Sequence, residues 1–133
     1  MTTRTPEELE EKLHYHFKNK ELLITALTHS SYANESKTPT LYNERLEFLG
    51  DAVLELVVTD YLYKNFSEPE GILTSWRAAL VRTESIGEAG VRLGYEHLVR
   101  MSRGEKRGSE RARLQILANA FEATIGSIYL DQG

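Results

Sequence analysis

The sequence predicts an all-α fold with two long central helices, in a single domain that covers residues 1–133. Apolar residues recur every three or four positions along nearly the whole chain, which places them on one face of a helix. No alternating run of apolar and polar residues is long enough to indicate a strand. The chain has a usual length for one domain, and no internal repeat or Pro/Gly/Ser-rich linker divides it.

Two short helices are expected in the first third of the chain. The first begins at a capping box, residues 5–8 (TPEE), with proline at the first helical position, and runs to about Phe17. The second covers residues 21–28. The polar segment 34–39 (NESKTP) is rich in turn-forming residues and is expected to end that helix.

The two long helices are expected at residues 41–64 and 109–130. In the second, an apolar stripe recurs every three or four residues, and almost no polar side chain interrupts it. The first contains one glycine, Gly50, which costs about 0.5–1 kcal/mol relative to alanine inside a helix. Such a glycine needs a reason, and a missing side chain would let another backbone approach closely.

Two further helices and a loop are expected between the long helices. The segment 67–71 (SEPEG) contains proline and glycine and breaks the chain. One helix then covers residues 72–82, and a capping box at Ser85 opens another that Gly94 closes. A glycine-flanked basic loop follows at residues 102–108.

Composition excludes several kinds of site and location. The chain has no cysteine, which excludes disulfides, thiolate metal sites and a cysteine nucleophile. No apolar run reaches the roughly 18 residues that span a bilayer, and the N-terminus has no signal-peptide pattern. We therefore expect a cytoplasmic protein without a membrane partner.

The charges are sorted along the chain. The net charge of −4 argues by itself against a nucleic-acid partner, because such a partner needs Lys and Arg to neutralise its phosphates. Residues 1–70 carry 7 basic and 13 acidic side chains, whereas residues 71–133 carry 9 basic and 7 acidic ones. The window 100–113 holds 6 basic and 2 acidic residues. This basic cluster is either a solvated loop and helix start or a surface that binds phosphates.

Three acids lie on one face of the first long helix. Glu44, Glu47 and Asp51 are spaced three and four residues apart, and like charges stacked in this way destabilise a helix. Apolar residues flank Glu47 and Asp51, so these carboxylates border an apolar surface. An acid in such a place must be paired or must coordinate a cation, whereas the alternative is a solvated acidic face.

The second long helix carries a matching polar pair, Asn119 and Glu122, inside its apolar run. If the two long helices pack together, Glu47, Asp51, Asn119 and Glu122 converge as four oxygen-bearing side chains. Oxygen ligands of this kind suit Mg²⁺ or Mn²⁺. The four histidines fall on separate segments and do not form a zinc site.

The segment 43–54 (NERLEFLGDAVL) resembles the signature helix of the ribonuclease III nuclease domain. Four further segments resemble the family in family order, namely 22–32 (LLITALTHSSY), the acid–glycine pair at 70–71, 77–82 (RAALVR) and 116–131 (ILANAFEATIGSIYLD). The resemblance implies a homodimeric endoribonuclease that cuts double-stranded RNA with Mg²⁺, for which Mn²⁺ can substitute. It also implies 5′-phosphate and 3′-hydroxyl ends and a role in processing rRNA and mRNA.

The resemblance assigns roles to single residues. The metal ligands are Glu47, Asp51, Asn119 and Glu122, of which Asp51 and Glu122 are the catalytic pair. Phe48 matches an aromatic residue that inserts into a pocket of the partner subunit; the alternative is a core aromatic of its own subunit.

The resemblance and the charge pattern also indicate an RNA cleft. Two acids match positions that face it, Glu44 and Glu70. Cations must fill this acidic surface before RNA can approach, and the basic stretch beside it would contact phosphates through Arg103, Lys106, Arg107 and Arg111. Recognition of A-form RNA would depend mainly on its shape.

The sequence departs from the family pattern in two places. Family members commonly carry aspartate where this chain has Asn119, whose amide oxygen can coordinate a cation but brings no charge. Bacterial members usually continue into a double-stranded-RNA-binding domain, whereas this chain stops at Gly133, so it is either an excised nuclease domain or relies on its cleft alone.

Two other functions remain open. One is a catalytically impaired ribonuclease III-like module that binds RNA or a ribonucleoprotein, and Asn119 is its only support. The other is a helical dimerisation scaffold whose acids are solvated.

Overall fold

The computed structural model describes residues 5–133 and confirms the all-α fold. Over this range the only β feature is an isolated bridge between Thr28 and Arg100. The helices are α1 (Pro6–Leu13), α2 (Lys20–Ala26), α3 (Ser30–Glu35), α4 (Glu44–Asn65), α5 (Glu70–Val81), α6 (Thr83–Arg92), the 3₁₀ turn η1 (Tyr95–His97), α7 (Arg103–Lys106) and α8 (Glu110–Gln132).

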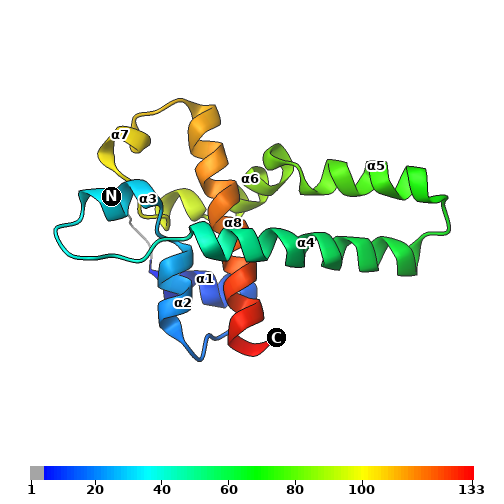
Figure 1. Ribbon diagram of the computed structural model, residues 1–133, viewed down its shortest axis with the longest axis horizontal. Helices are drawn as coiled ribbons and strands as arrows, with labels where there is room; N and C mark the ends of the chain where they lie inside the picture. Colours follow the sequence, from blue (N-terminus) through cyan, green and yellow to red (C-terminus); the bar gives the residue numbers. More distant parts are fainter. Residues whose placement is uncertain (1–4) are drawn as a thin grey trace.

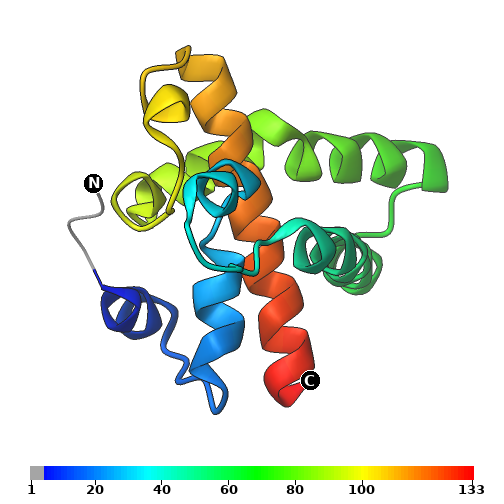
Figure 2. The same cartoon turned by 60° about the vertical axis from the view of Figure 1, so that its left-hand side comes forward.

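The two long helices, α4 and α8, cross at the centre of the molecule (Figure 1). From this crossing α4 runs outward, and α5 returns beside it to form a long helical hairpin that projects from the body. Helix α2 lies beside the C-terminal half of α8, α1 is seen end-on on the other side of α2, and α7 lies near the N-terminal end of α8 (Figure 2). The fold therefore places the start of α4 against the middle of α8.

The first helix ends at Leu13, so the prediction that it continues to about Phe17 is wrong. His14 adopts a left-handed conformation with φ of 54° and ends α1. The capping box is also incomplete, because the Thr5 side chain makes no capping hydrogen bond, although Pro6 does stand at the first helical position.

Two carboxylates hold the segment that follows α1 outside any helix. The Phe17 N–H donates to the buried Glu10 carboxylate at 2.7 Å, and the Lys18 and Asn19 N–H groups each donate to Asp131 at 2.9 Å. Lys20 also donates to Glu10 at 2.6 Å. Burial alone would raise the pKa of Glu10, but the bonds from Lys20 and Phe17 hold it below its ordinary value. These long-range bonds satisfy backbone donors that a longer helix would have used internally.

Three other local predictions need correction. Helix α3 extends into the first two residues of the polar segment 34–39, and the sequence indicated no helix there. Helix α6 begins at Thr83, and the hydroxyl of Ser85 donates to the carbonyl of Ala79 at 2.8 Å instead of capping a helix. The basic segment 102–108 is not simply a loop, because it contains α7, whose first turn Ser102 caps.

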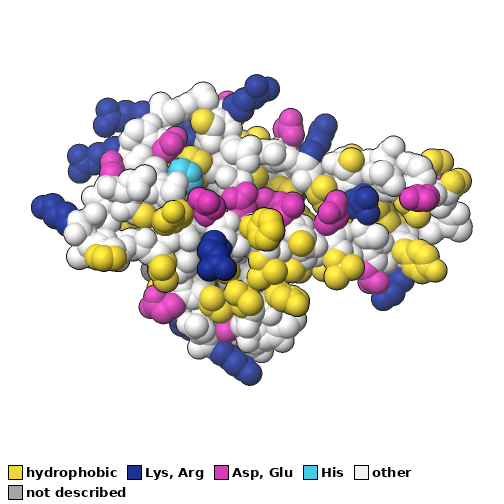
Figure 3. All heavy atoms as spheres, in the orientation of Figure 1, with side chains coloured by type: hydrophobic (Ala, Val, Ile, Leu, Met, Phe, Trp, Pro, Cys, Tyr) yellow, Lys and Arg dark blue, Asp and Glu magenta, His cyan; other side chains and the backbone are white. Residues whose placement is uncertain are grey.

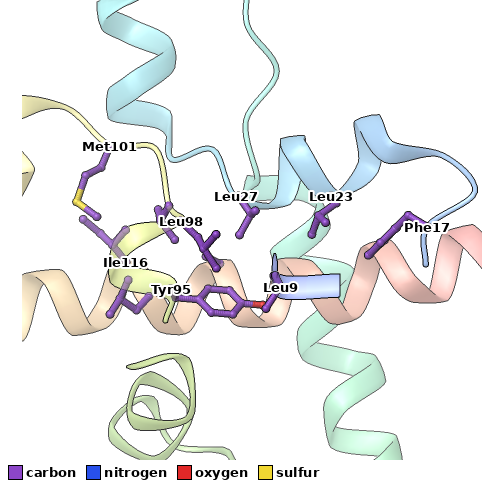
Figure 4. Close-up of a cluster of buried hydrophobic side chains, with 11 residues drawn as sticks. Leu9, Phe17, Leu23, Leu27, Tyr95, Leu98, Met101 and Ile116 are labelled. Atoms are coloured by element: carbon purple, nitrogen blue, oxygen red, sulfur yellow. The ribbon is translucent and has the colours of Figure 1, made fainter. Parts of the chain in front are cut away.

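The hydrophobic core lies between α1, α2, η1 and one face of α8 (Figure 4). Tyr95 is fully buried at its centre, and its hydroxyl donates to Thr124 on α8 at 2.8 Å. Burying each large apolar side chain contributes about 1.5–3 kcal/mol. One face of α8 is thereby fixed in the core, which leaves another face for the cleft described below.

Candidate active site

Helices α4 and α8 cross through two glycines. A β-carbon at Gly50 would lie 1.6 Å from the backbone oxygen of Glu122, and one at Gly126 would lie 2.4 Å from that of Leu46. Both distances are far shorter than any atomic contact allows, so the backbones touch where side chains normally separate helices. The close approach expected at Gly50 is therefore present, and Gly126 is its counterpart on α8.

This crossing brings the predicted residues of the two helices to one cleft, with a volume of about 1310 Å³. We call it the acidic cleft, and its polar lining includes Glu44, Glu47, Asp51, Glu84, Asn119 and Glu122. Acidic side chains form a row along α4 on the face shown in Figure 3. The third wall of the cleft comes from the junction of α5 and α6, around Arg82.

Two carboxyl groups of the acidic cleft, Glu122 and Glu47, have raised pKa values. Burial, a hydrogen bond shared with Asp51 and the charges of Asp51 and Glu47 together raise the pKa of Glu122 to about 8. Burial and the charges of Asp51 and Glu44 also raise the pKa of Glu47 above its ordinary value. Without a cation, Glu122 therefore keeps its proton near neutral pH.

The donor set fits a hard divalent cation in an open site. Within residues 5–133, no three His, Cys, Asp or Glu side chains form a ready-made metal cluster. Mg²⁺ does not need one, because it usually keeps several waters and takes one or two protein carboxylates together with substrate phosphates. Asn119 adds an amide oxygen, which already accepts a hydrogen bond from Gln115 at 2.9 Å and has a second lone pair available.

Other predicted residues lie away from the acidic cleft of the same chain. Glu70 lines a separate hollow between the far ends of α4 and α5, because α4 carries the chain well past Asp51 before α5 begins. The acidic cleft is not lined by the predicted basic residues Arg103, Lys106, Arg107 and Arg111. They belong to α7, the turn after it and the start of α8.

Five polar or charged residues of the cleft were missed by the sequence reasoning, namely Arg45, Arg82, Thr83, Glu84 and Gln115. Gln115 precedes Asn119 by one helical turn, a spacing that could have indicated it. Nothing in the local pattern places the α5–α6 junction beside α4, because that placement depends on how α6 packs against α8.

The fold and the site define an all-helical domain with a carboxylate-lined cleft between two crossing helices. A family model described as Ribonuclease-III-like matches residues 19–133, and the chain therefore belongs to that family. The resemblance inferred from the signature segment is confirmed.

Relatives and solved structures agree with this assignment. The chain is 47% identical over 126 residues to Ribonuclease 3 of Caldanaerobacter subterraneus subsp. tengcongensis, covering 94% of this chain and 55% of that protein. It is 50% identical over 131 residues to Ribonuclease 3 of Clostridium acetobutylicum, covering 98% and 56%. The chain thus spans about half the length of these curated relatives.

A structure of the nuclease domain of ribonuclease III from Campylobacter jejuni superposes with a TM-score of 0.86 at 44% identity. The match covers 96% of this chain and 86% of that one, whose description reports flexibility in a region involved in its dimer formation. In the described part of the present chain, no helix combines the length and apolar character needed to cross a membrane.

Proposed function

We propose that this chain is the nuclease portion of a cytoplasmic endoribonuclease that hydrolyses double-stranded RNA with a divalent cation and processes rRNA and mRNA. The observation that carries the proposal is the convergence of carboxylates from α4 and α8 in one open cleft, at a crossing that two glycines create. Membership of the ribonuclease-III-like family supports the same reaction.

In this proposal Glu47, Asp51, Asn119 and Glu122 hold Mg²⁺, and Mn²⁺ can replace it. When bound, the cation supplies Lewis-acid chemistry that activates water and neutralises charge on the phosphate. Glu122 must give up its proton for such a cation to bind, since it then acts as a negatively charged ligand. The remaining acids keep the cleft negative, and the cation would offset part of their repulsion toward the RNA phosphates.

The direct test is incubation of the purified chain with long double-stranded RNA, with and without Mg²⁺, followed by analysis of the fragment ends. The proposal predicts Mg²⁺-dependent fragments with 5′-phosphate and 3′-hydroxyl ends. Asn119 favours one alternative, an impaired module that binds RNA without cutting, because it removes a charge from the ligand set. Binding without fragments at any Mg²⁺ concentration would establish that alternative.

Replacing Asn119 with aspartate is expected to lower the Mg²⁺ concentration needed for half-maximal cleavage. The substitution adds a charge beside three carboxylates, and charges a few ångströms apart near a protein surface interact by a few kcal/mol at an effective dielectric of about 20, before desolvation is subtracted. A Mg²⁺ titration of the cleavage rate of both forms measures the midpoint.

The unmodified chain should remain active at millimolar Mg²⁺, roughly the concentration that weak sites for hard cations require. Glu110→Gln on the same helix serves as the control, because Glu110 is exposed and does not line the cleft. An unchanged Mg²⁺ midpoint for Asn119→Asp would show that residue 119 does not bind the cation.

We also propose that the chain forms a homodimer through α4. Phe48 is 82% exposed, and further large apolar side chains along α4 and α5 are exposed, including Leu56, Tyr63 and Leu80. Apolar side chains gather below the acidic row in Figure 3. A monomer seldom exposes so much contiguous apolar surface.

Phe48→Ala is expected to weaken this dimer by about thirtyfold or more, since a buried interface aromatic commonly contributes about 2 kcal/mol or more. Sedimentation across a concentration series measures the dissociation constant. Val91→Ala, which trims an exposed apolar residue on α6, is the control. A monomer at micromolar concentration for the unmodified chain would contradict the proposal.

A further inference from the structure

The acidic cleft is also lined by a positively charged side chain that is not one of the proposed metal ligands. Arg82 lines the cleft from the α5–α6 junction, opposite the acids of α4 and α8. The other basic residue in the lining is Arg45, which lies on α4 itself, next to the cleft acid Glu44. Arg82 is therefore the basic side chain on the wall that faces the carboxylates.

The guanidinium of Arg82 is unpaired within residues 5–133, although several acids line the same cleft. Arg77 on the preceding helix shows the usual arrangement, because it contacts Glu55 at 3.7 Å and donates to Thr59 at 3.0 Å. Arg82 makes no comparable ion pair or hydrogen bond and is exposed. Its charge is thus available to an anion that enters the cleft.

The backbone at Arg82 is held firmly. Arg82 is the single extended residue between α5 and α6, with φ of −69° and ψ of 157°. The hydroxyl of Ser85 donates to the carbonyl of Ala79 across this junction, at 2.8 Å. Helix α6 in turn packs on α8 at Gly87, where an added β-carbon would lie 2.5 Å from Leu114. The base of the Arg82 side chain therefore keeps a fixed place relative to α8.

We propose that Arg82 binds a backbone phosphate of the RNA as it enters the acidic cleft. A guanidinium offers a planar pair of donors that matches two phosphate oxygens, and its charge offsets the repulsion between the phosphate and the carboxylates. This inference rests on the proposed function and deepens it, because it names the residue that attracts the substrate to a surface of like charge.

The test compares Arg82→Ala and Arg82→Lys with Arg92→Ala, an exposed arginine at the end of α6 that does not line the cleft. KM and kcat for double-stranded RNA are measured at several salt concentrations, together with the melting temperature. Arg82→Ala should raise KM about tenfold, which corresponds to one charge-assisted hydrogen bond. It should also reduce the salt slope of kcat/KM by about one.

Arg82→Lys should keep the salt slope and recover only part of the affinity, because lysine keeps the charge but not the planar pair of donors. A role in structure alone would lower the melting temperature and leave the salt slope unchanged, which would overturn the inference. Equal kinetics for Arg82→Ala and Arg92→Ala would also overturn it and leave the proposed function intact. Failure of the unmodified chain to bind or cut double-stranded RNA would instead contradict both the inference about Arg82 and the proposed function.

Discussion

Replacing Glu122 with glutamine is expected to reduce cleavage of double-stranded RNA by about a hundredfold or more while sparing RNA binding. The variant removes a ligand charge from a cation site whose electrostatic contribution is several kcal/mol, and each 1.4 kcal/mol corresponds to about a factor of ten in rate. The pKa of Glu122 is about 8, so without a cation this side chain is already mostly neutral near pH 7. Glutamine resembles that neutral form, and the fold and the RNA affinity should persist.

The same substitution should change the pH dependence of cation binding. In the unmodified chain a proton competes with the cation at Glu122, so Mg²⁺ affinity should rise as pH increases through about 8. Titrations of Mn²⁺ binding at pH 6 to 9 would show this rise for the unmodified chain and its loss in Glu122→Gln. The control is Glu110→Gln. Retained Mg²⁺-dependent cleavage in Glu122→Gln would show that the cation lies elsewhere.

Much of the fold could be predicted because its helices follow local rules. The apolar periodicity of α8 and the proline before α5 depend only on neighbouring residues, and both elements occur close to their expected positions. The early end of α1 could not be predicted in this way. It depends on Glu10 and Asp131 accepting backbone hydrogen bonds from residues 17–19, and Asp131 is more than a hundred residues away in sequence.

The candidate site also contains residues that local sequence rules could identify and residues whose position depends on tertiary packing. Glu47, Asp51, Asn119 and Glu122 could be grouped because each pair repeats on one helix face and only the packing of two helices had to be assumed. Arg82 belongs to a junction whose place depends on a third helix, so no periodicity indicates it. Glu70 lines a separate hollow of this chain, because the length of α4 carries the chain away from the cleft before α5 begins.

The crossing of α4 and α8 should be the position least tolerant of a single added methyl group. Gly50→Ala would place a β-carbon 1.6 Å from the backbone oxygen of Glu122 and 2.9 Å from the backbone nitrogen of Gly126. Backbone atoms cannot move aside as a flexible side chain can, so the two helices must separate. Overpacking of this kind costs about 1–3 kcal/mol and occasionally more, and we expect about 3 kcal/mol here.

Gly71→Ala is the matched control, because Gly71 lies in the first turn of α5 with nothing within 4 Å of an added β-carbon. Alanine there should be neutral or stabilise the chain by up to about 1 kcal/mol through helix propensity. Thermal unfolding should therefore show a melting temperature lower by about 10 °C for Gly50→Ala and no loss for Gly71→Ala. Separation of the helices would also move Glu47 and Asp51 away from Glu122, so Gly50→Ala should lose cation binding at temperatures where it is still folded. Equal stability of the two variants would mean that α4 and α8 do not meet through their backbones, and the four candidate ligands would then lack the crossing that brings them together.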